Sequence, residues 1–234
     1  MNPSPLTRRR HLQCWTAAAL AAGLGAASRD ASALSEADAA AGIRAALERG
    51  ALAAVGLLGR DNGFLGNEKV RIPLPEQLQE LAKVMKAFGQ QRRVDELVTA
   101  MNRAAEQAVP KAQELLVKAV REMSVTDAKN ILTGGDDAAT RYFKGKTQAE
   151  LTTMFLPTVK QTTDKLALAK KYDKLAGKAS KFGLVKDEDA KIEGYVTRKA
   201  LDGLYAMIAE EEKAIRKNPV GAAGSLAKKV FGAL

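Results

Sequence analysis

A short motif in the middle of the chain places two carboxylates directly after two glycines. The motif is Thr133-Gly134-Gly135-Asp136-Asp137. Paired carboxylates can act as general acid and base, or can hold a sugar or a cation. A structural interpretation competes with this chemistry: Gly134 ends one helix, Asp136 caps the next, and Asp137 occupies a first turn where the helix dipole favours an anion. We favour the structural interpretation and keep both aspartates as weak catalytic candidates.

Glu212 is a further acidic candidate, because it falls on the apolar face of a predicted helix. At 100° per residue it shares that face with several apolar side chains: Leu201, Leu204, Tyr205, Ile208 and Ile215. A carboxylate in such a position needs a partner, or burial raises its pKa. We expect Arg216, four residues on, to pair with it, and Asn102 or Arg103 to reach it across the bundle. The functional alternative is a general acid or base in a cleft.

Lysines form the third group with possible chemistry. Residues 111–186 hold 15 basic and 8 acidic residues, whereas the segments 34–110 and 187–234 are balanced. A helix over residues 158–182 would place six lysines on an arc of about 100°: Lys160, Lys170, Lys171, Lys174, Lys178 and Lys181. A solvated outer face is the simplest interpretation, and contact with anionic envelope lipid or polysaccharide is the functional one. Nucleic acid is disfavoured, because the stripe contains no arginine for bidentate recognition.

The first 33 residues have the pattern of a cleavable signal peptide. Basic residues Arg8-Arg9-Arg10 precede a mostly apolar stretch from Trp15 to Ala27, and Ala31-Ser32-Ala33 offers a cleavage site. We expect cleavage before Leu34, with residues 25–27 as the other possible site. The arginine pair favours twin-arginine export, with the general secretory route as the alternative. The apolar stretch is shorter than the roughly 20 residues that a spanning helix needs. We therefore expect a bacterial periplasmic or secreted protein without a transmembrane anchor.

Removal of the signal peptide would narrow the available chemistry. The chain carries a formal charge of +10 and one residue each of His, Cys and Trp, all within the first 15 residues. The remaining segment 34–234 would contain none of them, so Ser-His-Asp, Cys-His and His- or Cys-based metal sites are excluded. We expect no metal and no cofactor. Any catalysis would depend on carboxylates, Lys, Tyr, Ser or Thr.

The rest of the sequence predicts helices throughout and no strand. An all-α, single-domain multi-helix bundle over residues 34–234 is expected, because caps, Pro and Gly separate segments with helical spacing of apolar residues. Residues 60–73 are predicted as a loop whose Phe64, Leu65 and Ile72 enter the core. Leu78, Leu81, Val84 and Met85 are predicted to face the core from the helix after that loop. The predicted helices cover residues 35–59, 75–89, 92–109, 110–123, 124–133, 136–143, 147–180 with an interruption at Pro157, 188–217, and a short one from Ser225.

Four separated motifs resemble those of an exported bacterial family. They are Ile72–Pro75, Met101–Glu106, Ile131–Thr140 and Lys199–Lys213, and they are similar to domain-of-unknown-function family 4197 in the same order along the chain. The resemblance implies an exported, single-domain, helical protein. It implies no activity and supplies no catalytic residue.

Three classes of function remain open from the sequence alone. The first is a binding or envelope-associated module that contacts anionic material through the lysine-rich helix. The alternative is a carboxylate-dependent hydrolase that uses Asp136, Asp137 or Glu212, and it requires these acids to converge in one cavity open to solvent. A purely structural assembly is a third possibility, and it would show a large exposed apolar patch.

Overall fold

A computed structural model describes residues 36–217, and within them the chain is α-helical without a strand. The all-α fold class is therefore confirmed. The predicted signal peptide, its cleavage site and the short helix from Ser225 lie outside the described residues. The helices are α1 Glu36–Leu58, α2 Glu76–Ala87, α3 Gln91–Ala108, α4 Ala112–Arg121, α5 Val125–Thr133, α6 Ala138–Thr163, α7 Ala167–Ser180 and α8 Ile192–Lys217, with short 3₁₀ turns η1 Val109–Lys111 and η2 Asp187–Asp189.

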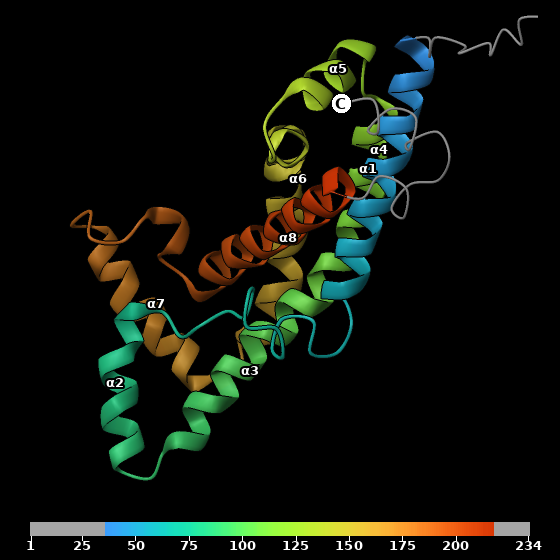
Figure 1. Cartoon of the computed structure of the whole chain (residues 1–234). Coiled ribbons are helices and arrows are strands. Elements are labelled where there is room, and N and C mark those ends of the chain that lie inside the picture. Colours follow the sequence, from blue (N-terminus) through green and yellow to red (C-terminus); the bar gives the residue numbers. More distant parts are fainter. Residues whose placement is uncertain (1–35, 218–234) are drawn as a thin grey trace, which may run out of the picture. The chain divides into compact units, whose positions relative to one another are not determined.

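Helices α6 and α8 form the centre of the bundle. Figure 1 shows α8 running across α6, and this is the most extensive helix pairing in the described chain. Helix α3 packs on α6, whereas α1 packs on α8 and α4. Helices α2, α3 and α7 lie together at the other end of the bundle, where α7 contacts both α2 and α3 (Figure 1). All of these helices belong to one compact unit.

Helix α6 is longer than the sequence pattern predicts. The predicted break between Phe143 and Thr147 and the interruption at Pro157 are both wrong, because one helix runs from Ala138 to Thr163. Residues 143, 147, 151, 155 and 159 are all fully buried and repeat every four positions, so packing on α3 and α8 holds the helix through both sites. Thr147 is not a cap: its hydroxyl lies 2.7 Å from the Phe143 carbonyl and 2.9 Å from the Tyr205 hydroxyl.

The real interruption follows Thr163. Leu166 has an extended backbone, and α7 begins at Ala167. Lys160 therefore belongs to α6, and Lys170, Lys171, Lys174 and Lys178 belong to α7. The expectation of one continuous lysine helix over residues 158–182 is wrong.

The loop between α1 and α2 enters the core as predicted. Phe64 and Ile72 are fully buried, and Leu65 is half-buried. Phe64 packs against α8 at Gly203, where a methyl group would lie only 2.7 Å from the aromatic ring. The loop thus depends on a glycine in a helix that is far away in the sequence.

Helix α2 buries a narrower face than predicted. Leu78 and Met85 are buried and Leu81 is half-buried, but the side chain of Val84 is 55% exposed. None of the helices in the described part of the chain has the length and hydropathy needed to cross a membrane.

Candidate functional site

Glu212 is buried, and both of its carboxylate oxygens accept hydrogen bonds. One oxygen accepts from the Ala139 backbone N–H at 3.0 Å, and the other accepts from the N–H and hydroxyl of Thr140 at 3.0 and 2.9 Å. These groups lie in the first turn of α6, where backbone N–H groups have no helical partner. Arg216 pairs with Glu212 at 2.9 Å. Glu212 is therefore the capping group of α6, supplied by α8, and its predicted partner Arg216 is confirmed.

The expected contribution of Asn102 and Arg103 to Glu212 is wrong. The Asn102 side chain accepts from the Ile72 N–H at 2.8 Å and donates to the Ile72 carbonyl at 3.0 Å. Arg103 pairs with Glu106 at 2.5 Å. These residues of α3 hold the loop before α2 instead, since buried Glu106 also accepts from the backbone N–H groups of Phe64 and Leu65. The sequence shows no local signal for these long-range pairs.

Asp136 and Asp137 are exposed in the turn between α5 and α6. Asp137 occupies the N-cap position of α6 without a side-chain capping bond, and it pairs with Arg141 in the next turn. Asp136 is not the capping residue. Gly134 ends α5 as predicted, and its φ of −79° is one that any residue can adopt. Lack of space explains the glycine instead, because a methyl group there would lie 2.7 Å from the Asn130 carbonyl oxygen.

The three acids do not form an active site. Glu212 is closed off by its N–H donors and Arg216, whereas the two aspartates are exposed. None of five main cavities among the described residues is lined by any of the three. The described residues also contain no group of acidic, His or Cys side chains suited to hold a metal ion. The hydrolase interpretation is left without a supporting observation.

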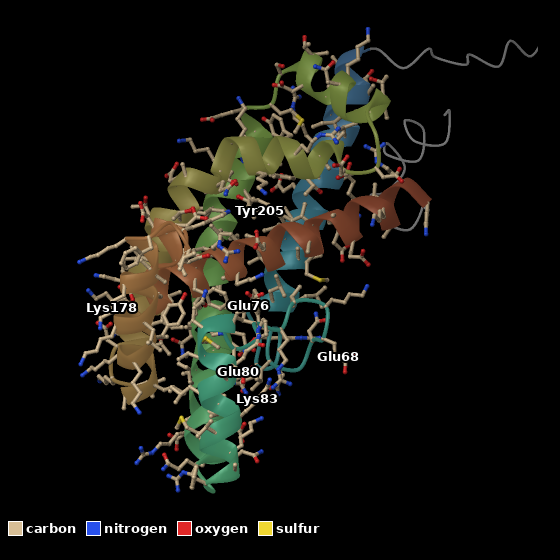
Figure 2. All side chains as sticks on the ribbon, turned by 90° about the vertical axis from the view of Figure 1, so that its left-hand side faces the viewer. Glu68, Glu76, Glu80, Lys83, Lys178 and Tyr205 are labelled. Carbon is tan, nitrogen blue, oxygen red and sulfur yellow. The ribbon has the colours of Figure 1, made fainter. Side chains whose placement is uncertain are left out.

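The lysines of α7 are exposed. We define the α7 basic surface as the exposed lysines and large apolar side chains of α7 and of the turn after it: Lys170, Lys171, Lys174, Leu175, Lys178, Lys181, Phe182 and Leu184. Figure 2 shows Lys178 on the outer side of α7, away from α2. The opposite side of the helix, with Leu168, Ala169, Tyr172 and Ala176, is buried.

The charges of this surface are not neutralised within the described part of the chain. None of its five lysines forms an ion pair with a described carboxylate, and Lys160 on α6 forms none either. The one carboxylate of α7, Asp173, is turned to α8 and accepts from the Ile192 N–H at 2.8 Å. Asp173 therefore caps the start of α8 and leaves the lysines as a block of like charge.

Apolar side chains interrupt and extend the lysine surface. Leu175 is 47% exposed, and Phe182 and Leu184 are 79% and 78% exposed. The turn that carries them depends on Gly183, whose φ of +68° is a conformation that favours glycine. Apolar side chains beside a basic helix face usually pack on the core, so the exposure of Leu175 and Phe182 could not be predicted from the sequence.

A polar cluster connects α7, η2 and α8. The Tyr172 hydroxyl donates to the Asp189 carbonyl at 2.6 Å, and Arg198 pairs with the Asp189 carboxylate at 2.6 Å. Arg198 also lies over the ring of Tyr195, 5.6 Å from its centroid. Burial raises the pKa of Tyr195 to about 12 and raises that of Tyr172 as well. Both phenols therefore stay protonated at neutral pH, and the cluster positions α7.

The comparisons with known proteins identify a family without an activity. The model of a family described as "Protein of unknown function (DUF4197)" matches residues 33–232. No curated protein and no solved structure gives a significant match.

Proposed function

Because the chain belongs to the DUF4197 family, whose description assigns no activity, we propose a function from the surface of the molecule itself. The protein is a peripheral binding module of the bacterial envelope that attaches to anionic lipid through the α7 basic surface. The observation that carries this proposal is the block of five lysines that pair with no described carboxylate and lie near exposed Leu175, Phe182 and Leu184.

Charge and apolar exposure together favour a membrane surface as the partner. Each lysine near an anionic membrane contributes about 1 kcal/mol to binding. Apolar side chains next to a basic helix face add burial at the boundary between headgroups and acyl chains. A soluble polysaccharide would use the charges but would leave Phe182 and Leu184 exposed, so we propose lipid and not polysaccharide. Export to the periplasm, predicted from residues 1–33, would bring the protein to such a surface.

Vesicle binding tests this function directly. Residues 34–234 are incubated with vesicles of phosphatidylglycerol or of phosphatidylcholine at low ionic strength, and the bound fraction is measured by sedimentation. We expect binding to the anionic vesicles alone, and loss of binding at high salt because exposed charges are screened. Removing two charges with Lys174→Gln/Lys178→Gln should weaken binding by about 30-fold, at roughly 1 kcal/mol per lysine.

A matched double variant separates this surface from general positive charge. Lys118 on α4 and Lys144 on α6 are also exposed, but neither belongs to the α7 basic surface. Lys118→Gln/Lys144→Gln removes the same net charge, and binding should fall by less than about 3-fold. Equal losses in the two double variants, or no binding of the wild-type unit to anionic vesicles, would refute the proposal.

A further inference from the structure

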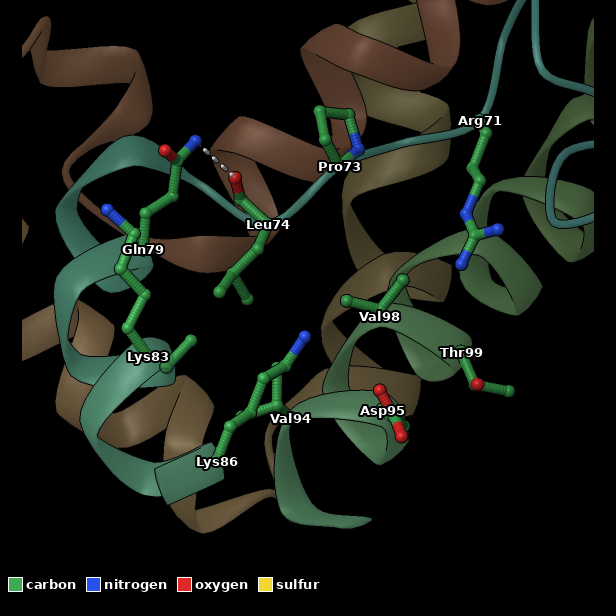
Figure 3. A pocket seen from close by; sticks show the side chains of 11 residues that line it. Arg71, Pro73, Leu74, Gln79, Lys83, Lys86, Val94, Asp95, Val98 and Thr99 are labelled. Carbon is green, nitrogen blue, oxygen red and sulfur yellow. Dashed lines mark hydrogen bonds between the residues drawn. The ribbon is translucent and has the colours of Figure 1, made fainter. Parts of the chain in front are cut away.

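A groove lies between α2, α3 and the segment that leads into α2. It has a volume of about 440 Å³, which is within the range of small-molecule sites in proteins. Its floor is formed by Leu74, Ala82, Val94 and Val98, of which Ala82 and Val94 are buried and the other two half-buried. Figure 3 shows this floor open between the two helices. The groove is separate from the α7 basic surface, since no residue of α7 lines it.

Charged side chains surround this apolar floor. In Figure 3 the Lys86 side chain points into the groove from α2, and the Arg71 guanidinium points into it from the opposite side. Neither side chain forms an ion pair with a described carboxylate. Lys83 also lines the groove, but its charge is matched by Glu80 at 2.7 Å. The remaining charge is that of Asp95 on α3, which lines the groove without an ion-pair partner among the described residues.

The balance of these charges defines the ligand. Two unmatched cations and one unmatched carboxylate leave a net charge of +1 above an apolar floor, which complements a single negative charge on an apolar chain. A guanidinium binds a carboxylate through two parallel hydrogen bonds, and an ammonium adds a further donor. A dianionic phosphate would leave one charge unmatched and would lie close to Asp95.

We propose that this groove binds the anion of a long-chain fatty acid. The carboxylate lies between Arg71 and Lys86, and the alkyl chain lies on Leu74, Val94 and Val98. This binding site is independent of membrane attachment through α7, so either proposal can fail without the other.

Calorimetric titration of residues 34–234 with dodecanoate, below its micelle concentration, tests the site. We expect saturable binding with a negative heat-capacity change, because apolar surface is buried. Acetate, which has the head without the chain, and dodecyltrimethylammonium, which has the chain with the opposite charge, should not bind. Arg71→Gln and Lys86→Gln should each weaken dodecanoate binding by about 10-fold, as expected for the loss of one charged hydrogen bond.

Two further variants make the assignment specific to this groove. Lys83→Gln removes a lysine whose charge Glu80 already matches, so its affinity for dodecanoate should stay within 2-fold of wild type. Asp95→Asn removes the only unmatched negative charge of the lining and should strengthen binding several-fold. Binding of anionic vesicles should be the same in Lys86→Gln as in wild type. The proposal is wrong if dodecanoate does not bind, if Lys83→Gln weakens binding as much as Lys86→Gln, or if Asp95→Asn has no effect.

Discussion

Glu212 shows how a carboxylate that could have been catalytic is instead part of the fold. It supplies the acceptors that the first turn of α6 lacks, and Arg216 balances its charge. Removing one partner of a buried ion pair is costly, because the other charge loses its compensation. We predict that Glu212→Gln lowers the free energy of unfolding by about 2–4 kcal/mol, measured by denaturant titration.

The neighbouring Glu211 provides a matched control for this prediction. It precedes Glu212 on the same helix and is only partly buried, and it forms no hydrogen bond or ion pair with the described residues of α6. Glu211→Gln should change the free energy of unfolding by less than about 0.5 kcal/mol, as is usual for surface positions. A Glu212→Gln protein as stable as the Glu211→Gln protein would contradict the capping role.

Helical spacing was enough to predict the contacts of Glu212 within its own helix, but not those with other elements. Its position on the core face and its pairing with Arg216 follow from the period of 3.6 residues and the i,i+4 relation. Its bond to the α6 N-terminus joins residues that are 73 positions apart in the sequence. The Asn102–Ile72 and Glu106–Phe64 pairs join residues 30 and 42 positions apart. No local pattern encodes such contacts, so they could not be predicted from one sequence.

The packing of α8 on the loop before α2 requires a residue without a side chain at position 203. At Gly203 an added methyl group would lie 2.7 Å from Phe64, which is closer than real contacts allow. Overpacking of this kind costs about 1–3 kcal/mol. We predict that Gly203→Ala lowers the melting temperature, although alanine has the higher helix propensity. Gly145 of α6 has open space around it, and Gly145→Ala should raise the melting temperature. If Gly203→Ala were also stabilising, the close packing of Phe64 on α8 would be disproved.

Element boundaries were predicted well where the signal was local. The predicted bounds 124–133 match α5 closely, because a Ser124–Asp127 capping box is present at its start and Gly134 ends it. In contrast, Thr147 and Pro157 resemble a cap and a helix breaker, but tertiary packing of α6 overrides both local preferences. The break after Thr163 has no glycine or proline to mark it. For this reason Lys160 was assigned to the wrong helix. Lys170, Lys171, Lys174 and Lys178 do share α7, and Lys181 follows its last residue.

Two turns of the molecule expose a phenylalanine near basic residues, but the net charge of the residues around each turn differs. Phe88, between α2 and α3, is as exposed as Phe182. Residues 76–96 around Phe88 contain four acidic and four basic residues, so this turn has no net charge. Residues 165–186 contain seven lysines and one carboxylate, Asp173, which is turned to α8. An anionic membrane should therefore attract the turn after α7 and not the turn after α2.

A tryptophan placed at each turn reports which one enters the membrane. Residues 34–234 contain no tryptophan, so Phe182→Trp and Phe88→Trp each give a single fluorophore at an exposed site. With phosphatidylglycerol vesicles, we predict that the emission of the Phe182→Trp protein shifts to shorter wavelength as its side chain leaves water, and that the emission of the Phe88→Trp protein does not shift. A shift at position 88 alone, or at neither position, would contradict attachment through α7.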